Sequence, residues 1–316
     1  MHNRRNFIKN ALTPLAINKL TGMLEFDKIK NIGIQLFSLP KLLEDDFLMT
    51  IKMLAKIGYT ELEFFGPYSF SHPAAHEGWK VITPMLGFSG SGYFGKDIQE
   101  IKMILDDHDM TSPSAHTDLN TLIHHMDQMA EAAHILGHQY VILPAIPDDR
   151  RQSLDDYSRI AETFNQIGEN AKKAGIKFTY HNHGYGIKPW GEVSPLEIIF
   201  NETDPELVFF EMDIYWTAAG GADPVSWLRK YGSRYRLLHI KDMKPRKEFS
   251  GDGNDAPQWI ELFPFMTSAG DGDLGVEEIV ETAQSTGVEH FIVEQDMVVN
   301  PERALARSFD FLNKKI

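Results

Sequence analysis

Short apolar runs alternate with amphipathic segments along most of the chain, as expected for repeated pairs of strand and helix. Residues 32–37 are predicted to form a buried strand, and residues 46–57 carry apolar side chains at helical spacing. Gly58 ends this helix, because glycine readily adopts the left-handed conformation of a helix cap, and a second strand follows over residues 59–64. The same order of helix, glycine and strand recurs at Gly137, Gly175 and Gly287.

This pattern continues to eight predicted strands, each followed by a helical segment. The other six strands cover residues 112–116, 140–143, 178–183, 207–213, 236–240 and 291–293. The clearest helix spans residues 153–174, where Ser153 can cap the first turn, and the last helix opens with Asn300 and Pro301. Eight such pairs predict an α/β protein with a single (β/α)8 TIM barrel over residues 29–316.

Two predicted connections are long, residues 66–93 after the second strand and residues 243–273 after the seventh. Long loops in compact domains often cover functional sites. Both connections leave the same end of the barrel, so we expect the functional site at that end.

Composition restricts the ligand. The net charge of −14 argues against nucleic acid, because phosphate binding requires clustered Lys and Arg. The chain has no cysteine, which excludes disulfides and thiolate ligands, so any metal must be held by His, Asp and Glu. These features favour a small-molecule ligand.

The first residues resemble a twin-arginine export signal, with Arg4 and Arg5 followed by Phe7 and Lys9. The apolar run that follows is short and contains Pro14. Residues 1–28 are therefore predicted to be either a leader, which would make the protein periplasmic or exported, or a disordered N-terminus of a cytoplasmic protein. No other stretch approaches the roughly 20 apolar residues of a membrane helix, so no membrane insertion is predicted.

Polar side chains gather at the ends of the predicted strands, where the working groups of such barrels lie. They are Ser38, Glu63, His116, His181, His183, Asp213, His239, Lys241, Glu294 and Asp296. Strand alternation directs His181, Asp213, His239 and Glu294 toward one point. Two imidazoles and two carboxylates suit Mn²⁺, Co²⁺ or Zn²⁺, whereas Mg²⁺ prefers oxygen ligands. Taken singly, each residue could equally be a core histidine, a loop cap or a salt-bridge partner.

The neighbouring groups have two interpretations each. Glu211 shares the parity of Asp213 one layer deeper, which favours a supporting carboxylate over a ligand. His183 could contact the substrate or support the ligands, and Lys241 could face a substrate oxygen or solvent. His116 and Glu63 are candidates for proton transfer or for structural hydrogen bonds.

Aromatic residues lie at the same end, and they could pack on the apolar face of a sugar ring or only on other loops. They are Tyr215, Trp216, Trp190 and Trp259.

Five motifs, in this order, resemble the sugar phosphate isomerase/epimerase family of the xylose-isomerase-like barrel superfamily. They are Ser114-Ala115-His116, Tyr180-His181-Asn182-His183, Phe210-Glu211-Met212-Asp213-Ile214-Tyr215-Trp216, His239-Ile240-Lys241-Asp242 and Val293-Glu294-Gln295-Asp296. The resemblance implies a divalent metal at the ends of the fifth to eighth strands, held here by His181, Asp213, His239 and Glu294.

One position departs from that family, whose epimerases generally carry glutamate where this chain has His181. Glu294 could still act as a base beside the ion. We interpret the chain as a metal-dependent isomerase or epimerase that removes a proton next to the carbonyl of a sugar or keto-sugar. The alternative, which the His-Asn-His motif resembles, is a 3-keto-glycoside lyase or hydratase, and a third is a non-catalytic sugar-binding barrel. A homo-oligomer is compatible with each.

Overall fold

The computed structural model describes residues 28–296 and 298–315. The predicted leader over residues 1–28 therefore lies, except for Lys28, outside the described residues. Across the described part of the chain, no helix combines the length and apolar character needed to cross a bilayer.

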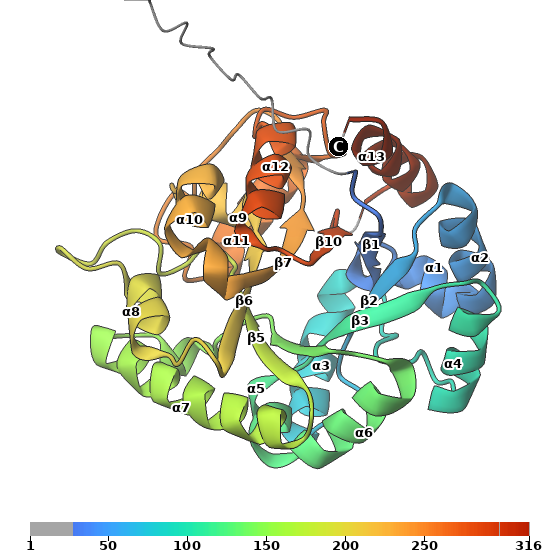
Figure 1. The fold of residues 1–316 in the computed structure, drawn as a ribbon, viewed down its shortest axis with the longest axis horizontal. Helices are drawn as coiled ribbons and strands as arrows, with labels where there is room; N and C mark the ends of the chain where they lie inside the picture. The colour runs from blue at the N-terminus through green and yellow to red at the C-terminus, as the bar shows by residue number, and fades with distance from the viewer. Residues whose placement is uncertain (1–27, 297, 316) are drawn as a thin grey trace, which may run out of the picture.

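Eight parallel strands in the described chain close into a barrel, which confirms the predicted fold (Figure 1). The strands are β1 (Ile32–Gln35), β2 (Glu61–Phe65), β3 (Thr111–His116), β4 (Tyr140–Leu143), β5 (Lys177–His181), β6 (Val208–Asp213), β7 (Tyr235–Ile240) and β10 (His290–Val293). Neighbours in sequence pair in parallel around the barrel, and β1 closes it against β10 with Ile34 opposite Val293.

Helices surround the barrel and bury the outer faces of the strands (Figure 1). The main ones are α1 (Pro40–Asp45), α2 (Phe47–Ile57), α4 (Ile98–Asp106), α5 (Leu119–His124), α6 (Met126–Leu136), α7 (Leu154–Lys173), α8 (Pro195–Glu202), α9 (Ile214–Ala219), α10 (Pro224–Tyr231), α12 (Val276–Thr286) and α13 (Pro301–Lys315). In α7, the Ser153 side chain caps the Asp156 amide and the apolar stripe is buried, as the sequence predicts. Inside the barrel, Tyr140, Ile142, Leu237 and Ile292 form an apolar layer.

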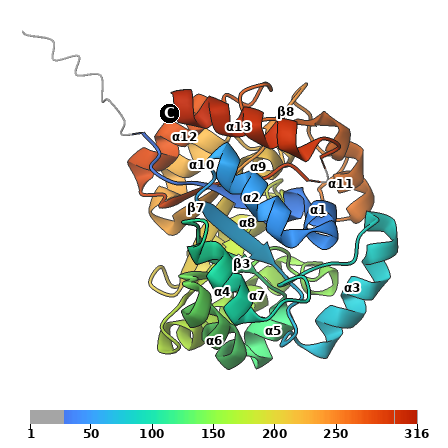
Figure 2. The ribbon, with the colours of Figure 1, turned by 90° about the vertical axis from the view of Figure 1, so that its right-hand side faces the viewer.

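Both long connections contain structure of their own. The first carries α3 (Pro73–Leu86), and the second carries α11 (Ala256–Leu262) and the 3-10 helix η4 (Phe263–Phe265). Figure 2 shows α3 and α11 at the same end of the barrel. This arrangement agrees with the prediction that both connections leave one end.

The second connection also contains a small antiparallel pair that periodicity did not indicate, β8 (Asp242–Met243) with β9 (Met266–Thr267). The Asp242 carboxylate accepts hydrogen bonds from the amides of Gly270 and Gly272 at 3.0 and 2.9 Å. One buried side chain therefore fixes the point where this connection leaves the barrel and the point to which it returns.

Candidate active site and metal centre

The four side chains predicted to converge do lie together at the carboxyl ends of neighbouring strands. His181 ends β5, Asp213 ends β6, His239 lies near the end of β7 and Glu294 follows β10 directly, and each is at most 6% exposed. His181 Nε2 lies 3.7 Å from Asp213 Oδ2, and His239 Nδ1 lies 2.8 Å from Glu294 Oε2. The possible ligand atoms of Asp213, His239 and Glu294 lie within 4.8 Å of one another, whereas His181 forms such a group with His116, Glu211 and His239. The role of these residues as ligands stays a prediction.

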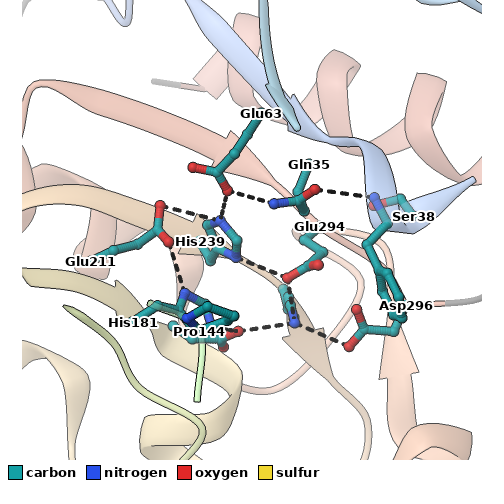
Figure 3. Close-up of polar contacts among 12 residues, drawn as sticks. Gln35, Ser38, Glu63, Pro144, His181, Glu211, His239, Glu294 and Asp296 are labelled. Atoms are coloured by element: carbon teal, nitrogen blue, oxygen red, sulfur yellow. Dashed lines mark hydrogen bonds and ion pairs between the residues drawn. The ribbon is translucent and has the colours of Figure 1, made fainter. Parts of the chain in front are cut away.

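Carboxylates support the rear nitrogen of each of these two imidazoles (Figure 3). Glu211 Oε2 lies 2.8 Å from His181 Nδ1, and Glu63 Oε1 lies 2.6 Å from His239 Nε2. This arrangement directs His181 Nε2 and His239 Nδ1 toward the centre, as in metal sites where an outer carboxylate orients a histidine ligand. Glu211 thus lies behind His181, on the Nδ1 side of its ring, as strand parity indicates.

Glu63 and His116 belong to a buried network. Glu63 accepts hydrogen bonds from Gln35 at 2.7 Å and from the Ser114 hydroxyl, and its Oε1 lies 3.0 Å from His116 Nε2. Burial alone would raise the pKa of Glu63, but His116 and His239 hold it well below its usual range. Burial would lower the pKa of His116, but Glu63 and Glu211 raise it to about 9. Both groups are therefore charged at neutral pH.

Lys241 lies among the carboxylates of Asp213, Glu294 and Asp296, and Figure 3 labels the last two. Its Nζ is 3.0 Å from Asp213 Oδ2, 2.5 Å from Glu294 Oε2 and 3.0 Å from Asp296 Oδ2. Although burial would lower the pKa of Lys241, these carboxylates raise it. Lys241 is 2% exposed, so the alternative of a surface charge is wrong.

His181 and His183 are neutral. Burial, assisted by His239, lowers the pKa of His181, and burial with Lys241 lowers the pKa of His183 to about 3. A neutral imidazole has a free lone pair, which a metal ligand requires. His183 lies beyond the end of β5, and its Nδ1 donates to the Pro144 carbonyl oxygen at 2.5 Å. The predicted strand over residues 178–183 is therefore two residues too long.

The donor set fits a divalent cation. Four buried carboxylates, those of Glu63, Glu211, Asp213 and Glu294, and that of half-buried Asp296 face the cationic groups Lys241, His116 and His239. Burial and the neighbouring Glu294 carboxylate raise the pKa of Asp296 to about 7. The crowding of these carboxylates favours a divalent ion, while its identity stays a prediction.

The predicted aromatic contacts differ in accessibility. The Tyr215 hydroxyl donates to the Leu262 carbonyl oxygen at 2.5 Å, and its side chain is fully buried below the second long connection. The Trp216 ring centroid lies 5.7 Å from Lys241 Nζ, and its Nε1 is buried without a hydrogen-bond partner in the described chain. Half-buried Trp259 lies 5.4 Å from His183 between ring centroids. Trp216 and Trp259 thus border the centre, whereas Tyr215 packs away from it.

Sequence reasoning missed two features of the site. Gln35 and Ser114 orient Glu63, and their signal was their inward parity on β1 and β3. A cavity of about 490 Å³ lies between η4, β9 and the start of α13, and Asp296 and Gln295 line it. The cavity is large enough for a small molecule, and it lies next to the ion pair of Lys241 and Asp296.

The fold and the site together define a (β/α)8-barrel enzyme with its ionisable groups at the carboxyl ends of the strands. A family model described as xylose isomerase-like TIM barrel matches residues 51–315. The chain belongs to this family, and the resemblance noted in the sequence is confirmed.

Individual relatives agree with this assignment. An inosose dehydratase of Clostridium perfringens is 25% identical over 263 residues, which cover 73% of this chain and 86% of that protein. An inosose dehydratase of Lacticaseibacillus casei is 26% identical over 175 residues, 53% of this chain and 57% of that protein. The solved structure of a sugar phosphate isomerase/epimerase from Parabacteroides distasonis superposes with a TM-score of 0.69 at 25% identity, covering 90% of this chain and 93% of that one.

Proposed function

We propose that this protein is a divalent-metal-dependent lyase that removes a proton next to the carbonyl of a keto-sugar or keto-polyol and expels the β-substituent. The similarity to inosose dehydratases supports elimination of water from a cyclic polyhydroxy ketone. Elimination therefore ranks ahead of isomerisation here, the reverse of the order that the sequence alone suggests.

The observation that carries this proposal is the position of the proton-transfer groups. Glu294 and Asp296 both follow β10 on one side of the centre, whereas the end of β5 carries the neutral imidazole of His181. Epimerisation between two carboxylates would need a base on each face of the substrate carbon. A single base can support elimination, because it can return the same proton to the departing hydroxyl.

His181, Asp213, His239 and Glu294 would hold the metal, which supplies Lewis-acid polarisation of the substrate carbonyl when bound. Asp296 is the base that we propose, because its pKa of about 7 would let it take up and release a proton near neutral pH and it borders the cavity. Lys241 would stabilise negative charge that develops on the substrate oxygen. Glu63, Glu211 and His116 are assigned to orienting the ligands, since their polar atoms already contact one another and the two histidines.

Turnover of a cyclic polyhydroxy ketone and of a 3-keto-glucoside tests the proposal. With Mn²⁺, Co²⁺ or Zn²⁺ we expect loss of water or of the aglycone, and Asp296→Asn should lower kcat by about 10²- to 10⁴-fold without weakening metal binding. The matched control is Asp271→Asn, an acid that lines the same cavity farther from Lys241. Formation of an isomeric sugar with retention of every hydroxyl would instead establish an isomerase.

A further inference from the structure

The second long connection places one of its aromatic side chains, Trp259, beside a histidine of the active site. We call residues 244–265, which carry α11 and η4, the lid segment. Within it, the Trp259 ring lies 5.4 Å from His183 and 6.1 Å from Tyr185, measured between ring centroids, and is nearly parallel to Tyr185 with an interplanar angle of 26°. The lid segment therefore places the indole ring of Trp259 beside His183 of the site.

A buried arginine, Arg151, lies at the far end of this aromatic row. It is 4% exposed, and its guanidinium carbon lies 4.2 Å from the Tyr185 ring centroid. Its Nε donates to the Ile146 carbonyl oxygen at 3.0 Å, and its Nη1 donates to Asn254 Oδ1 at 2.6 Å. One planar cation thus joins the connection after β4, the connection after β5 and the lid segment.

A short turn carries this connection from Arg151 to Trp259. The Asn254 side-chain amide donates to Asp252 Oδ2 at 2.6 Å, which turns Oδ1 of Asn254 toward Arg151. In the same turn, the Gly253 carbonyl oxygen accepts a hydrogen bond of 2.8 Å from Trp259 Nε1. The position of the indole therefore depends on the turn that Arg151 holds.

Without the hydrogen bond to Asn254, the other contacts of Arg151 would not offset the free-energy cost of burying its charge. Its nearest carboxylate is Asp148, at 3.5 Å, and that side chain is 71% exposed. Opening the lid segment would leave Nη1 without its acceptor, and a buried donor without a partner is costly. The arginine thus favours the closed position of the segment.

We propose that Arg151 is a positioning residue that fastens the lid segment and so holds Trp259 against His183. Its catalytic consequence rests on the proposed function, whereas its effect on the lid segment does not. Loss of the hydrogen bond between Arg151 and Asn254 should let the Trp259 side chain move. Small displacements of a side chain that positions the substrate reduce turnover strongly.

Arg151→Gln and Asn254→Ala test this proposal from the two ends of one hydrogen bond. In each variant we expect faster amide hydrogen exchange over residues 250–262 and a red shift of the Trp259 emission, which subtraction of Trp259→Phe isolates from the other tryptophans. We also expect kcat/KM to fall between about 10- and 100-fold, with metal affinity unchanged. Arg151→Lys, which keeps the charge but not the planar fork, should lie between the wild type and Arg151→Gln.

The neighbouring exposed Arg150 provides the matched control, and Arg150→Gln should behave as the wild type. Half-buried Asn254 keeps the test valid if Arg151→Gln fails to fold. Wild-type exchange over residues 250–262 in Asn254→Ala, together with unchanged Trp259 emission, would overturn the proposal whatever the activity. If the lid segment loosens but the wild type has no lyase activity, the proposed function fails and the role of Arg151 stands.

Discussion

Two neighbouring histidines of this site differ in charge, because one is positive and the other neutral. The rings of His116 and His181 lie 5.2 Å apart, and both are buried. Two carboxylates approach the same nitrogen of His116, which raises its pKa to about 9, whereas burial and the nearby His239 lower the pKa of His181. His181 could therefore bind a metal without first losing a proton, whereas His239, whose pKa the neighbouring carboxylates raise, would release a proton on binding one.

His138 predicts a pH dependence of stability. It is buried between β3 and α6, where its Nδ1 lies 2.8 Å from the Ser112 carbonyl oxygen, and burial lowers its pKa to about 4. The unfolded chain therefore binds a proton below about pH 6.5 that the native chain excludes, so stability is full above that pH and falls as the pH drops toward 4.

Between pH 7 and pH 5 this one group should cost roughly 2 kcal/mol. Urea unfolding of the wild type and of His138→Gln at both pH values measures the difference. The variant should lose less stability than the wild type over this interval, and exposed His134→Gln should lose as much as the wild type. Equal losses in His138→Gln and the wild type would contradict the assignment.

At the scale of elements, the connection after β5 packs directly on α9. Gly184 follows His183 with φ of +82°, and a Cβ there would lie 2.3 Å from the Trp216 carbonyl oxygen. No side chain fits between the two segments at this point. Glycine therefore allows the close approach that places His183 beside Trp216.

Gly184→Ala should destabilise the protein by about 2–4 kcal/mol, because it adds a backbone clash to an unfavourable φ. Gly191→Ala is the matched control, since Gly191 also has a positive φ, of +71°, but nothing lies within 4 Å of its added Cβ. Its cost should be only about 1–2 kcal/mol. Chemical unfolding of both variants gives the comparison, and equal losses would exclude the clash as the cause.

The sequence could predict the elements that have strong periodicity and clear ends. The strand over residues 140–143 and the cap at Ser153 are found as predicted, because apolar alternation and cap chemistry are local. The end of β5 at His181 and the β8–β9 pair could not be predicted, since strand ends and two-residue strands depend on contacts made after folding. The convergence of His181 and His239 followed from parity, but the link between Arg151 and Asn254 spans 103 residues and has no local signal.

At the scale of the whole molecule, the net charge of −14 includes an excess of carboxylates buried at the barrel mouth. A ligand that binds only the folded state stabilises it in proportion to the logarithm of its concentration. A divalent cation should therefore stabilise this protein strongly by binding where the carboxylates crowd.

Removal of metal with EDTA should lower the unfolding free energy, and Mn²⁺ or Zn²⁺ at about 1,000 times its Kd should restore about 4 kcal/mol. His181→Ala should abolish most of this effect, whereas half-buried His76→Gln should retain it. Unfolding curves at several metal concentrations provide the measurement. A full metal effect in His181→Ala would place the ion elsewhere.

The Asp242 carboxylate accepts hydrogen bonds from the amides of Gly270 and Gly272 and so joins the two ends of the connection between β7 and α12. This connection is therefore a loop that is closed where it meets the barrel. The entropy cost of closing such a loop grows slowly with its length, so insertions and deletions inside it should change stability little. Evolution can therefore remodel this part of the barrel mouth while His239 and Lys241 keep their places. For engineering, the segment between Asp242 and Gly270 is a natural unit to exchange between family members when a new substrate range is wanted.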